Sequence, residues 1–459
     1  MPAKKPTYRT LDPSTGELIE EYPVATAAEL DRRLDVATRA FADWRKRPFA
    51  DRRAVLEKAA SLLEAQARPL ALTMALEMGK TLAEGEAEAK KCAAACRYYA
   101  ENGEAILAPV AAKSDGSEAW VRYEPLGPIL AIMPWNFPFW QVFRFAAPAL
   151  AAGNVGVLKH ASSVPRCALA IERILLEAGA PEGVFQSIFL SGEQASGAIG
   201  DRRIRGVTLT GSTRAGHEVA SAAGRALKPM VMELGGSDPF LVFADADLEK
   251  AAKVAAASRC LNAGQSCISA KRFLVEASAY QRFRDDFVAH LEAKKMGDPR
   301  QPGVELGPLA RADLRDELAR QVAAAVAAGA RILCGGQVPK GPGAFYPPTA
   351  FEGLDPAAPE AQEELFGPAA ALYSFEDEEE ALEIANGTPF GLGASLWSSD
   401  RDRIDRLVPE LECGSVFVGG LVKSDPRLPF GGVKESGFGR ELAAEGLREF
   451  TNVKTLWIA

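Results

Sequence analysis

From about residue 127 onward, short apolar runs alternate with helical segments of roughly 15 residues. Apolar runs of this length, bounded by glycine and proline, are typical of strands buried on both faces of a parallel sheet. Their alternation with helices predicts βαβ units and therefore an α/β fold. The first series is Pro128–Met133, Asn154–Lys159, Val184–Leu190, Ile204–Thr210 and Pro229–Leu234; a second, from Pro239 to about Leu411, includes Lys271–Glu276, Arg331–Cys334 and Ala369–Phe375.

The two ends of the chain follow other patterns. Apolar residues three and four apart predict helices at Ala27–Trp44, Ala50–Gln66 and Leu70–Tyr99. The final segment, Phe450–Ile458, alternates between apolar and polar residues like a strand. Because no partner strand lies near it in sequence, we predict that it pairs with another subunit.

Length and charge exclude several classes of protein. At 459 residues the chain is long enough for two or three domains. Its net charge of −8, from 53 basic and 61 acidic residues, argues against a nucleic acid partner. The most apolar stretch, 126–158, is interrupted by prolines, Asn136 and Arg144, so it does not predict a membrane span. Met1–Pro6 leads into a polar segment and shows no secretory signal.

The cysteines and histidines indicate neither a disulfide scaffold nor a metal site. Seven scattered cysteines favour a reducing, cytoplasmic location. Cys92 and Cys96 lie one helical turn apart, and we expect them to pack within a helix. Only three histidines occur, far apart in sequence, and Cys-x-x-Cys is absent, so we predict no bound metal.

Two motifs place reactive side chains at turns. Cys267 follows the polar turn Asn262–Ser266, and a turn that leads into a helix N-terminus stabilises a thiolate. Taken alone, a cysteine in this position is more often a buried packing residue. Glu233 closes an apolar strand and precedes two glycines, at the strand end where the sites of parallel sheets open. The alternative for Glu233 is a solvated loop carboxylate.

Two further motifs follow predicted strands. In Pro134–Pro138, the amide side chain of Asn136 is held between two prolines and two aromatic residues. In Thr208–Gly216, a strand ends in Gly211-Ser212 and a helix begins, a turn that can bind phosphate. It is not the Gly-x-Gly-x-x-Gly fingerprint, and alone it is a weak signal for a nucleotide.

Together these motifs resemble the aldehyde dehydrogenase family, and the resemblance runs from the N-terminal helices to the C-terminal strand. It is closer to succinate-semialdehyde dehydrogenases through segments 139–144, 233–240 and 422–426. The motifs are Pro-Trp-Asn-Phe-Pro at 134–138, Thr-Gly-Ser at 210–212, Glu-Leu-Gly-Gly at 233–236, Gly-Gln-Ser-Cys at 264–267, Glu-Glu-Leu-Phe-Gly-Pro at 363–368 and Pro-Phe-Gly-Gly at 429–432.

The resemblance implies a domain organisation and a homo-oligomer. A Rossmann-type cofactor domain would comprise residues 1–113 and 130–232, and an α/β catalytic domain residues 233–440. A small β extension, 114–129 with 441–459, would join subunits into a homodimer or homotetramer.

The resemblance also implies a mechanism. The thiolate of Cys267 attacks the aldehyde carbon, and the side-chain amide of Asn136 and the backbone N–H of Cys267 hold the oxyanion. Hydride transfer to an NAD(P) cofactor leaves a thioester, which is hydrolysed by a water molecule that Glu233 activates. The presence of both Cys267 and Glu233 argues against a catalytically silent protein on this fold.

Cofactor contacts follow position by position from the resemblance. NAD-preferring members usually carry Glu three residues after the lysine, where this chain has Ser162. A carboxylate there would repel a 2′-phosphate by up to about 4 kcal/mol, so its absence favours NADP over NAD. The alternative is that Ser162 caps a helix beginning at 163 or 164. The implied contacts are Pro134 and Trp135 with the adenosine ribose, Lys159 with the ribose hydroxyls, Gly211 and Ser212 with the pyrophosphate, Leu234 with the nicotinamide, Glu364 with its ribose and Phe366 with the ring edge.

For the substrate, Asn136, Trp140 and Arg144 lie at i, i+4 and i+8 of a predicted helix, near one face. An arginine beside aromatic side chains requires an anion, and a substrate carboxylate would satisfy it in bidentate fashion. Ser424 and Phe430 are predicted to complete the pocket. These residues predict an ω-carboxy aldehyde, first of all succinate semialdehyde. If Arg144 pairs with a protein acid instead, the alternative is a broad aliphatic aldehyde dehydrogenase.

Overall fold

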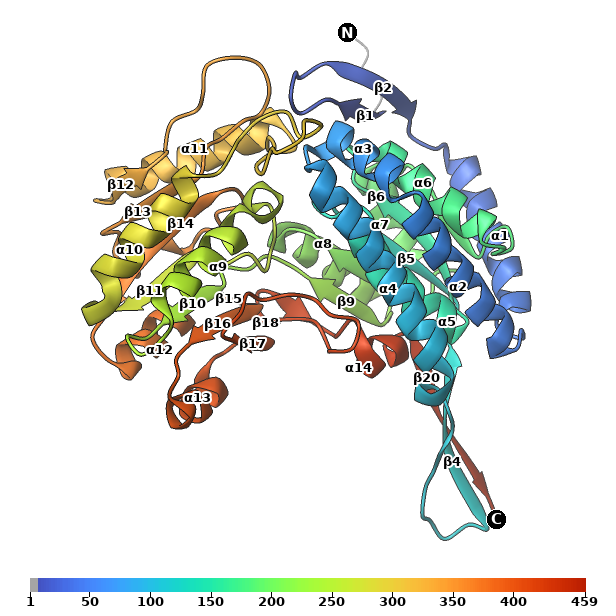
Figure 1. Cartoon of the computed structure of the whole chain (residues 1–459). Coiled ribbons are helices and arrows are strands. Elements are labelled where there is room, and N and C mark those ends of the chain that lie inside the picture. The colour runs from blue at the N-terminus through green and yellow to red at the C-terminus, as the bar shows by residue number, and fades with distance from the viewer. Residues whose placement is uncertain (1–6) are drawn as a thin grey trace.

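The computed structural model describes residues 7–459, and its ribbon divides into two lobes, each built around one large sheet (Figure 1). Each sheet has its own hydrophobic core. The prediction that the first six residues carry no secretory signal lies outside the described residues.

The first lobe contains a six-stranded sheet in the order β19-β9-β8-β5-β6-β7. Neighbours among β5 to β9 pair in parallel, which confirms the predicted βαβ pattern, and only β19 is antiparallel. The strands are β5 (Pro128–Met133), β6 (Val155–His160), β7 (Phe185–Ser187), β8 (Gly206–Thr210), β9 (Met230–Glu233) and β19 (Gly437–Phe438); the intervening helices are α5 (Trp140–Ala152), α6 (Pro165–Glu177), α7 (Gly192–Gly200) and α8 (Thr213–Arg225).

The N-terminal region packs onto this lobe as helices α1 (Ala27–Trp44), α2 (Phe49–Ala65), α3 (Ala67–Met78) and α4 (Leu82–Ile106). The single helix predicted over Leu70–Tyr99 is wrong, because Gly79 takes a left-handed φ of 81°. A Cβ there would lie 2.6 Å from the carbonyl oxygen of Pro308. Thr81 then caps α4 in a capping box with Glu84. The hairpin of β1 (Thr7–Leu11) and β2 (Leu18–Pro23) was not predicted.

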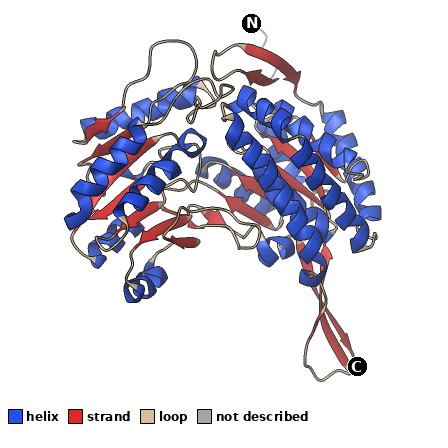
Figure 2. Ribbon diagram, viewed as in Figure 1, coloured by secondary structure: helices blue, strands red, loops and turns tan. Residues whose placement is uncertain are grey.

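The second lobe contains a seven-stranded sheet in the order β12-β13-β14-β11-β10-β16-β17, parallel except for the β12–β13 pair. Helices pack beside the strands in both lobes (Figure 2). The strands are β10 (Pro239–Val242), β11 (Arg272–Glu276), β12 (Arg331–Cys334), β13 (Thr349–Glu352), β14 (Ala369–Phe375), β16 (Gly393–Trp397) and β17 (Ser415–Val418); the helices are α9 (Leu248–Cys260), α10 (Ala277–Glu292), α11 (Ala312–Ala327), α12 (Glu378–Asn386) and α13 (Arg401–Leu407), and β15 (Phe390–Gly391) pairs with β18 (Val433–Lys434).

The C-terminal strand β20 (Thr451–Ile458) projects from the first lobe after the short helix α14 (Ala443–Arg448) (Figure 1). Its pairing with another subunit stays a prediction; within its own chain it pairs antiparallel with β4 (Glu118–Pro125), which also pairs with β3 (Val110–Ala111). This pairing was missed because the two segments are far apart in sequence. One edge of β20 remains free.

Candidate active site

A cavity of about 270 Å³ is lined by residues from both large sheets and their loops. It gathers most of the predicted catalytic and cofactor residues, and it also brings in four that sequence reasoning missed, Gln141, Thr210, Gly235 and Leu314. The predicted residues that line it are Asn136, Cys267, Pro134, Trp135, Gly211, Ser212, Leu234, Glu364 and Phe366.

The turn that carries Asn136 is fixed by a buried carboxylate on α4. Glu88 accepts hydrogen bonds from the backbone N–H groups of Phe139 and Trp140 at 2.8 and 2.9 Å. Its negative charge is balanced by an ion pair with buried Lys80. Asn136 itself lies before α5, so the prediction that it shares a helix with Trp140 is wrong.

The same turn is held from β6 by His160. Its Nε2 lies 2.9 Å from the carbonyl oxygen of Pro138, and its Nδ1 lies 2.9 Å from the amide nitrogen of Ala161 and 3.2 Å from the carbonyl oxygen of Met133. Burial lowers the pKa of His160 to about 4 and keeps the ring neutral. One N–H of the Asn136 amide donates to the Gln265 carbonyl at 3.0 Å, which leaves the second N–H free for an oxyanion.

The turn before Cys267 is backbone-strained. Asn262 and Ala263 both have φ of 54°, and Gly264 has φ of 72°. A left-handed conformation costs an ordinary residue about 1–2 kcal/mol, so the surrounding contacts must hold it. Gly264 is required at its position, because a Cβ would lie 2.3 Å from the backbone of Gly367.

Two buried cations hold this loop. Arg259 donates to the carbonyl of Gly264. Lys271 donates to the carbonyl of Cys267 at 2.8 Å and pairs with Glu364 at 3.3 Å. The nucleophile loop and the carboxylate predicted to face the cofactor therefore share one lysine.

The thiol of Cys267 has no helix N-terminus behind it. The predicted helix after Cys267 is wrong, because the chain continues through a loop into β11. Burial raises the pKa of Cys267 to about 12, and the charges of Arg144 and Lys271 only partly oppose this effect. The thiol is therefore protonated at neutral pH, and its activation requires a base.

Glu233 is a buried carboxylate at the end of β9, not the solvated loop residue that was the alternative. Its Oε1 has no hydrogen-bond partner among the described residues. Burial, with a smaller contribution from the charge of Glu441, raises its pKa, while Arg144 and Arg440 oppose the rise. A Cβ on Gly431 would lie 2.8 Å from Oε1, so glycine there makes room for the carboxylate. A carboxylate with a raised pKa is suited to act as a base near neutrality.

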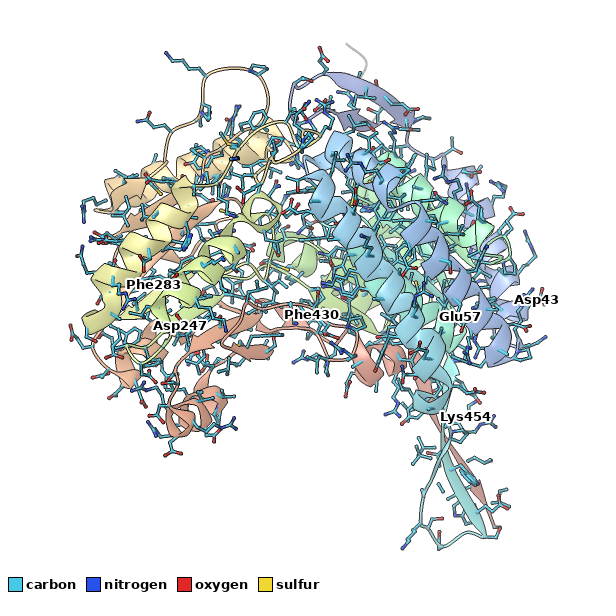
Figure 3. The ribbon with its side chains drawn as sticks, in the orientation of Figure 1. Asp43, Glu57, Asp247, Phe283, Phe430 and Lys454 are labelled. Atoms are coloured by element: carbon cyan, nitrogen blue, oxygen red, sulfur yellow. The ribbon has the colours of Figure 1, made fainter. Side chains whose placement is uncertain are left out.

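Arg144 does not line the cavity. It is buried and forms an ion pair with buried Glu441, and it also donates to the hydroxyl of Thr210 at 3.2 Å. The guanidinium lies 4.5 Å from the ring centroid of Phe430, which is located between the two lobes (Figure 3). The anion that pairs with Arg144 is therefore a protein carboxylate. This is the alternative stated above to pairing with a substrate carboxylate. Glu441 was missed because it carries no local motif.

Trp140 and Ser424 meet at a hydrogen bond in which the indole Nε1 donates to Oγ at 2.9 Å. Lys91, on α4, joins them and donates to the same Oγ at 2.7 Å. Sequence reasoning missed Lys91, because it lies among the mixed charges of a helix whose other side is exposed.

The predicted cofactor residues occupy the ends of strands β6, β8 and β9. Lys159 is partly buried and forms no ion pair among the described residues. Ser162 is exposed, and the cap of α6 is Val164 without a side-chain hydrogen bond, so Ser162 is not the helix cap. Ser212 caps α8 by accepting from the N–H of Ala215 at 3.4 Å.

Two contacts order the cofactor residues of the second lobe. Glu364 accepts from the N–H of Gly236 at 3.1 Å. Phe366 lies edge-on to Trp135, with ring centroids 5.8 Å apart. Residues 7–459 contain no group of three side chains of the kinds that bind metals and no helix both long and apolar enough to cross a membrane.

A thiol, a fixed amide and a buried carboxylate beside a Rossmann-like sheet define an aldehyde-oxidising dehydrogenase. Residues 1–456 match the aldehyde dehydrogenase family, and the chain belongs to it. It is 50% identical over 453 residues to a succinate-semialdehyde dehydrogenase (NADP(+)) of Mycobacterium tuberculosis, covering 98% of this chain and 99% of the relative. A Mycobacterium avium protein of the same name is 49% identical, with 98% and 96% covered.

Among solved structures, the succinic semialdehyde dehydrogenase of Streptococcus pyogenes in complex with NADP+ has a TM-score of 0.96 and 38% identity. The alignment covers 98% of this chain and 99% of that chain. The predicted aldehyde dehydrogenase fold is confirmed.

Proposed function

We propose that the protein oxidises succinate semialdehyde, or a similar ω-carboxy aldehyde, to the dicarboxylate with NADP as cofactor. The observation that carries the proposal is the meeting of Cys267 and Asn136 in one cavity with the predicted cofactor residues. The names of the relatives from both Mycobacterium species and from Streptococcus pyogenes support the substrate and the cofactor.

The first chemical step forms a bond between Sγ of Cys267 and the aldehyde carbon, and the thiol proton passes to a water molecule, which acts as the base. The carbonyl oxygen becomes an oxyanion, which accepts from the free N–H of Asn136 and from the backbone N–H of Cys267. A bound nicotinamide cofactor would supply the acceptor for the hydride of this carbon, and Cys267 would then hold the acyl group as a thioester. Because Gln265 and the turn around His160 fix the Asn136 amide, its donor is preorganised for this step.

Glu233 acts in the second half of the reaction. It takes a proton from water, the hydroxide attacks the thioester carbon, and the C–S bond breaks to release the acid and the Cys267 thiolate. Its burial suits this role, because a raised pKa makes a carboxylate a stronger base. Glu233 closes β9, directly before Leu234 and Gly235, which line the cavity.

The chain offers a fitting site for NADP. Lys159 is a cation without an ion-pair partner among the described residues, and Ser162 leaves its neighbourhood free of a carboxylate. The N-terminus of α8, after Gly211 and Ser212, suits a pyrophosphate. Lys159, Ser162 and the α8 turn would hold the phosphates and ribose of the cofactor.

A second candidate function is a broad aliphatic aldehyde dehydrogenase, and the pairing of Arg144 with Glu441 favours it, because Arg144 no longer requires a substrate carboxylate. Steady-state kinetics with succinate semialdehyde and butyraldehyde, each with NADP and NAD, separate the two. We expect a higher kcat/KM for succinate semialdehyde and for NADP. A preference for butyraldehyde contradicts the substrate, and a preference for NAD contradicts the cofactor.

We further propose a homodimer or homotetramer in the cytoplasm. All seven cysteines lie within the described residues, and none is in a disulfide, which suits a reducing compartment. The three-stranded sheet carries exposed apolar side chains and a free strand edge, features that suit pairing with a second copy. These side chains are Val110, Val453, Leu456, Trp457 and Ile458.

A further inference from the structure

Two carboxylates one turn apart on α4 reach toward the active site, although like charges at this spacing repel each other. Glu88 accepts from two backbone N–H groups of the segment that carries Asn136. Glu84 reaches the second lobe, where its Oε1 accepts from the backbone N–H of Asn262 at 2.7 Å. The helix α4 therefore holds both of the segments that supply donors to the oxyanion.

The two oxygens of Glu84 have different partners. Oε2 accepts from the hydroxyl of Thr81 at 2.8 Å and from the backbone N–H of Thr81 at 3.3 Å, which closes the capping box of α4. Oε1 is left to accept from Asn262. Because the cap already orders the Glu84 side chain, its contact with Asn262 costs little additional conformational entropy.

Asn262 connects Glu84 to the predicted oxyanion donor. Its φ of 54° lies in the left-handed region, which asparagine tolerates better than most residues. Its Nδ2 donates to the backbone carbonyl of Asn136 at 2.7 Å and to that of Gln265 at 3.1 Å. The Asn136 amide donates to the same Gln265 carbonyl at 3.0 Å. One buried side chain thus fixes both the backbone of Asn136 and the acceptor that orients its amide.

These hydrogen bonds close a ring that runs from Glu84 through Asn262 and Asn136 to Glu88, and so back to α4. The ring matters because the two oxyanion donors come from different lobes, the amide of Asn136 from the first and the backbone N–H of Cys267 from the second. Fixed donors stabilise a developing charge only if their separation is held, and a displacement of about 1 Å costs up to about a hundredfold in rate.

We propose that Glu84 is a positioning residue of the oxyanion site, which acts through Asn262 to hold Asn136 at a fixed place relative to Cys267. The inference rests on the proposed roles of Asn136 and Cys267, and it adds to them a residue that does not line the cavity. Since the contact serves a donor that is needed in the transition state, its loss should lower kcat and leave KM nearly unchanged.

The test is Glu84→Ala, assayed with NADP and the aldehyde that the wild type prefers. We expect kcat to fall about tenfold, less than the loss of an oxyanion donor itself, and KM to change by less than about twofold. Thr81→Ala is the control for stability, because it weakens the cap but leaves Oε1 on Asn262; its Tm should fall and its kcat should not. Glu86→Gln is the control for charge, because Glu86 pairs with exposed Arg68 and should behave as wild type.

Two further variants follow the path of the effect. Asn262→Gly removes the side-chain donor, while glycine adopts the left-handed conformation without strain, so its kcat should fall as that of Glu84→Ala does. In an Asn136→Ala background, Glu84→Ala should cause little additional loss, because both changes act on the same donor.

Failure of this inference is distinguishable from failure of the proposed mechanism. If Glu84→Ala keeps the wild-type kcat, or if Thr81→Ala loses as much, the contact with Asn262 serves only stability and the inference is overturned. Losses of Glu84→Ala and Asn136→Ala that multiply in the double variant overturn it as well. Asn262→Gly with the wild-type kcat does so too, whether or not Glu84→Ala folds. If Asn136→Ala itself keeps the wild-type kcat, the proposed oxyanion donor fails, whatever Glu84→Ala does.

Discussion

Arg144→Ala tests whether the buried ion pair with Glu441 is part of the scaffold. The substitution removes the guanidinium and leaves the Glu441 carboxylate buried without its cation. Loss of one partner of a buried pair costs roughly 3–5 kcal/mol. A domain of 150–250 residues loses roughly 2–4 °C in Tm per kcal/mol, so the first lobe should melt about 6–20 °C lower.

The assay is thermal unfolding followed by circular dichroism, with the double variant Arg144→Met/Glu441→Leu beside the single one. Because apolar side chains of similar volume replace both charges, the double variant should recover most of the lost Tm. In kinetics, Arg144→Ala should lower kcat/KM for succinate semialdehyde and butyraldehyde by a similar factor, since the guanidinium does not line the cavity.

Two results would refute this reasoning. If Arg144→Ala melted like the wild type and lost activity only with succinate semialdehyde, Arg144 would be a ligand of the substrate carboxylate. If the fall in Tm of the double variant equalled the sum of the falls of the two single variants, the two charges would not stabilise each other.

The remaining predictions concern the chemical steps and the cofactor. Cys267→Ala should abolish dehydrogenase turnover but retain NADP binding, measured by fluorescence titration; substantial residual turnover would contradict the nucleophile. Glu233→Gln should release a burst of about one equivalent of reduced cofactor and then stall, whereas loss of the burst would place Glu233 in thiol deprotonation. Ser162→Glu should raise KM for NADP strongly and KM for NAD little, and equal effects would contradict the assigned contact.

The strands of both large sheets could be predicted because burial on two faces leaves continuous apolar runs. The runs at 128–133, 331–334 and 369–375 match β5, β12 and β14 to the residue. The hairpin at Thr7–Pro23 has no such continuous apolar run, since every residue of β2 is at least partly exposed. The partner of β20 also escaped prediction, because antiparallel pairing with β4 depends on a contact between distant segments.

The residues of the site likewise divide into those that local sequence predicts and those that it does not. Asn136 and Cys267 line one cavity, and Glu233 directly precedes two residues that line it; because each follows or closes a local motif, this arrangement could be anticipated from strand ends alone. The partners that set their protonation could not, because Glu441, Lys271 and Arg440 act across the fold. The thiol pKa is the clearest case: the predicted helix N-terminus would have lowered it, and burial raises it.

The cations around α5 differ in what balances their charges. Lys80 and Arg144 are each paired with a protein carboxylate, so their charges are satisfied before any substrate enters. Lys91 has only a hydroxyl and an indole ring, neither of which carries a negative charge. The charge of Lys91 is therefore balanced less completely than those of Lys80 and Arg144.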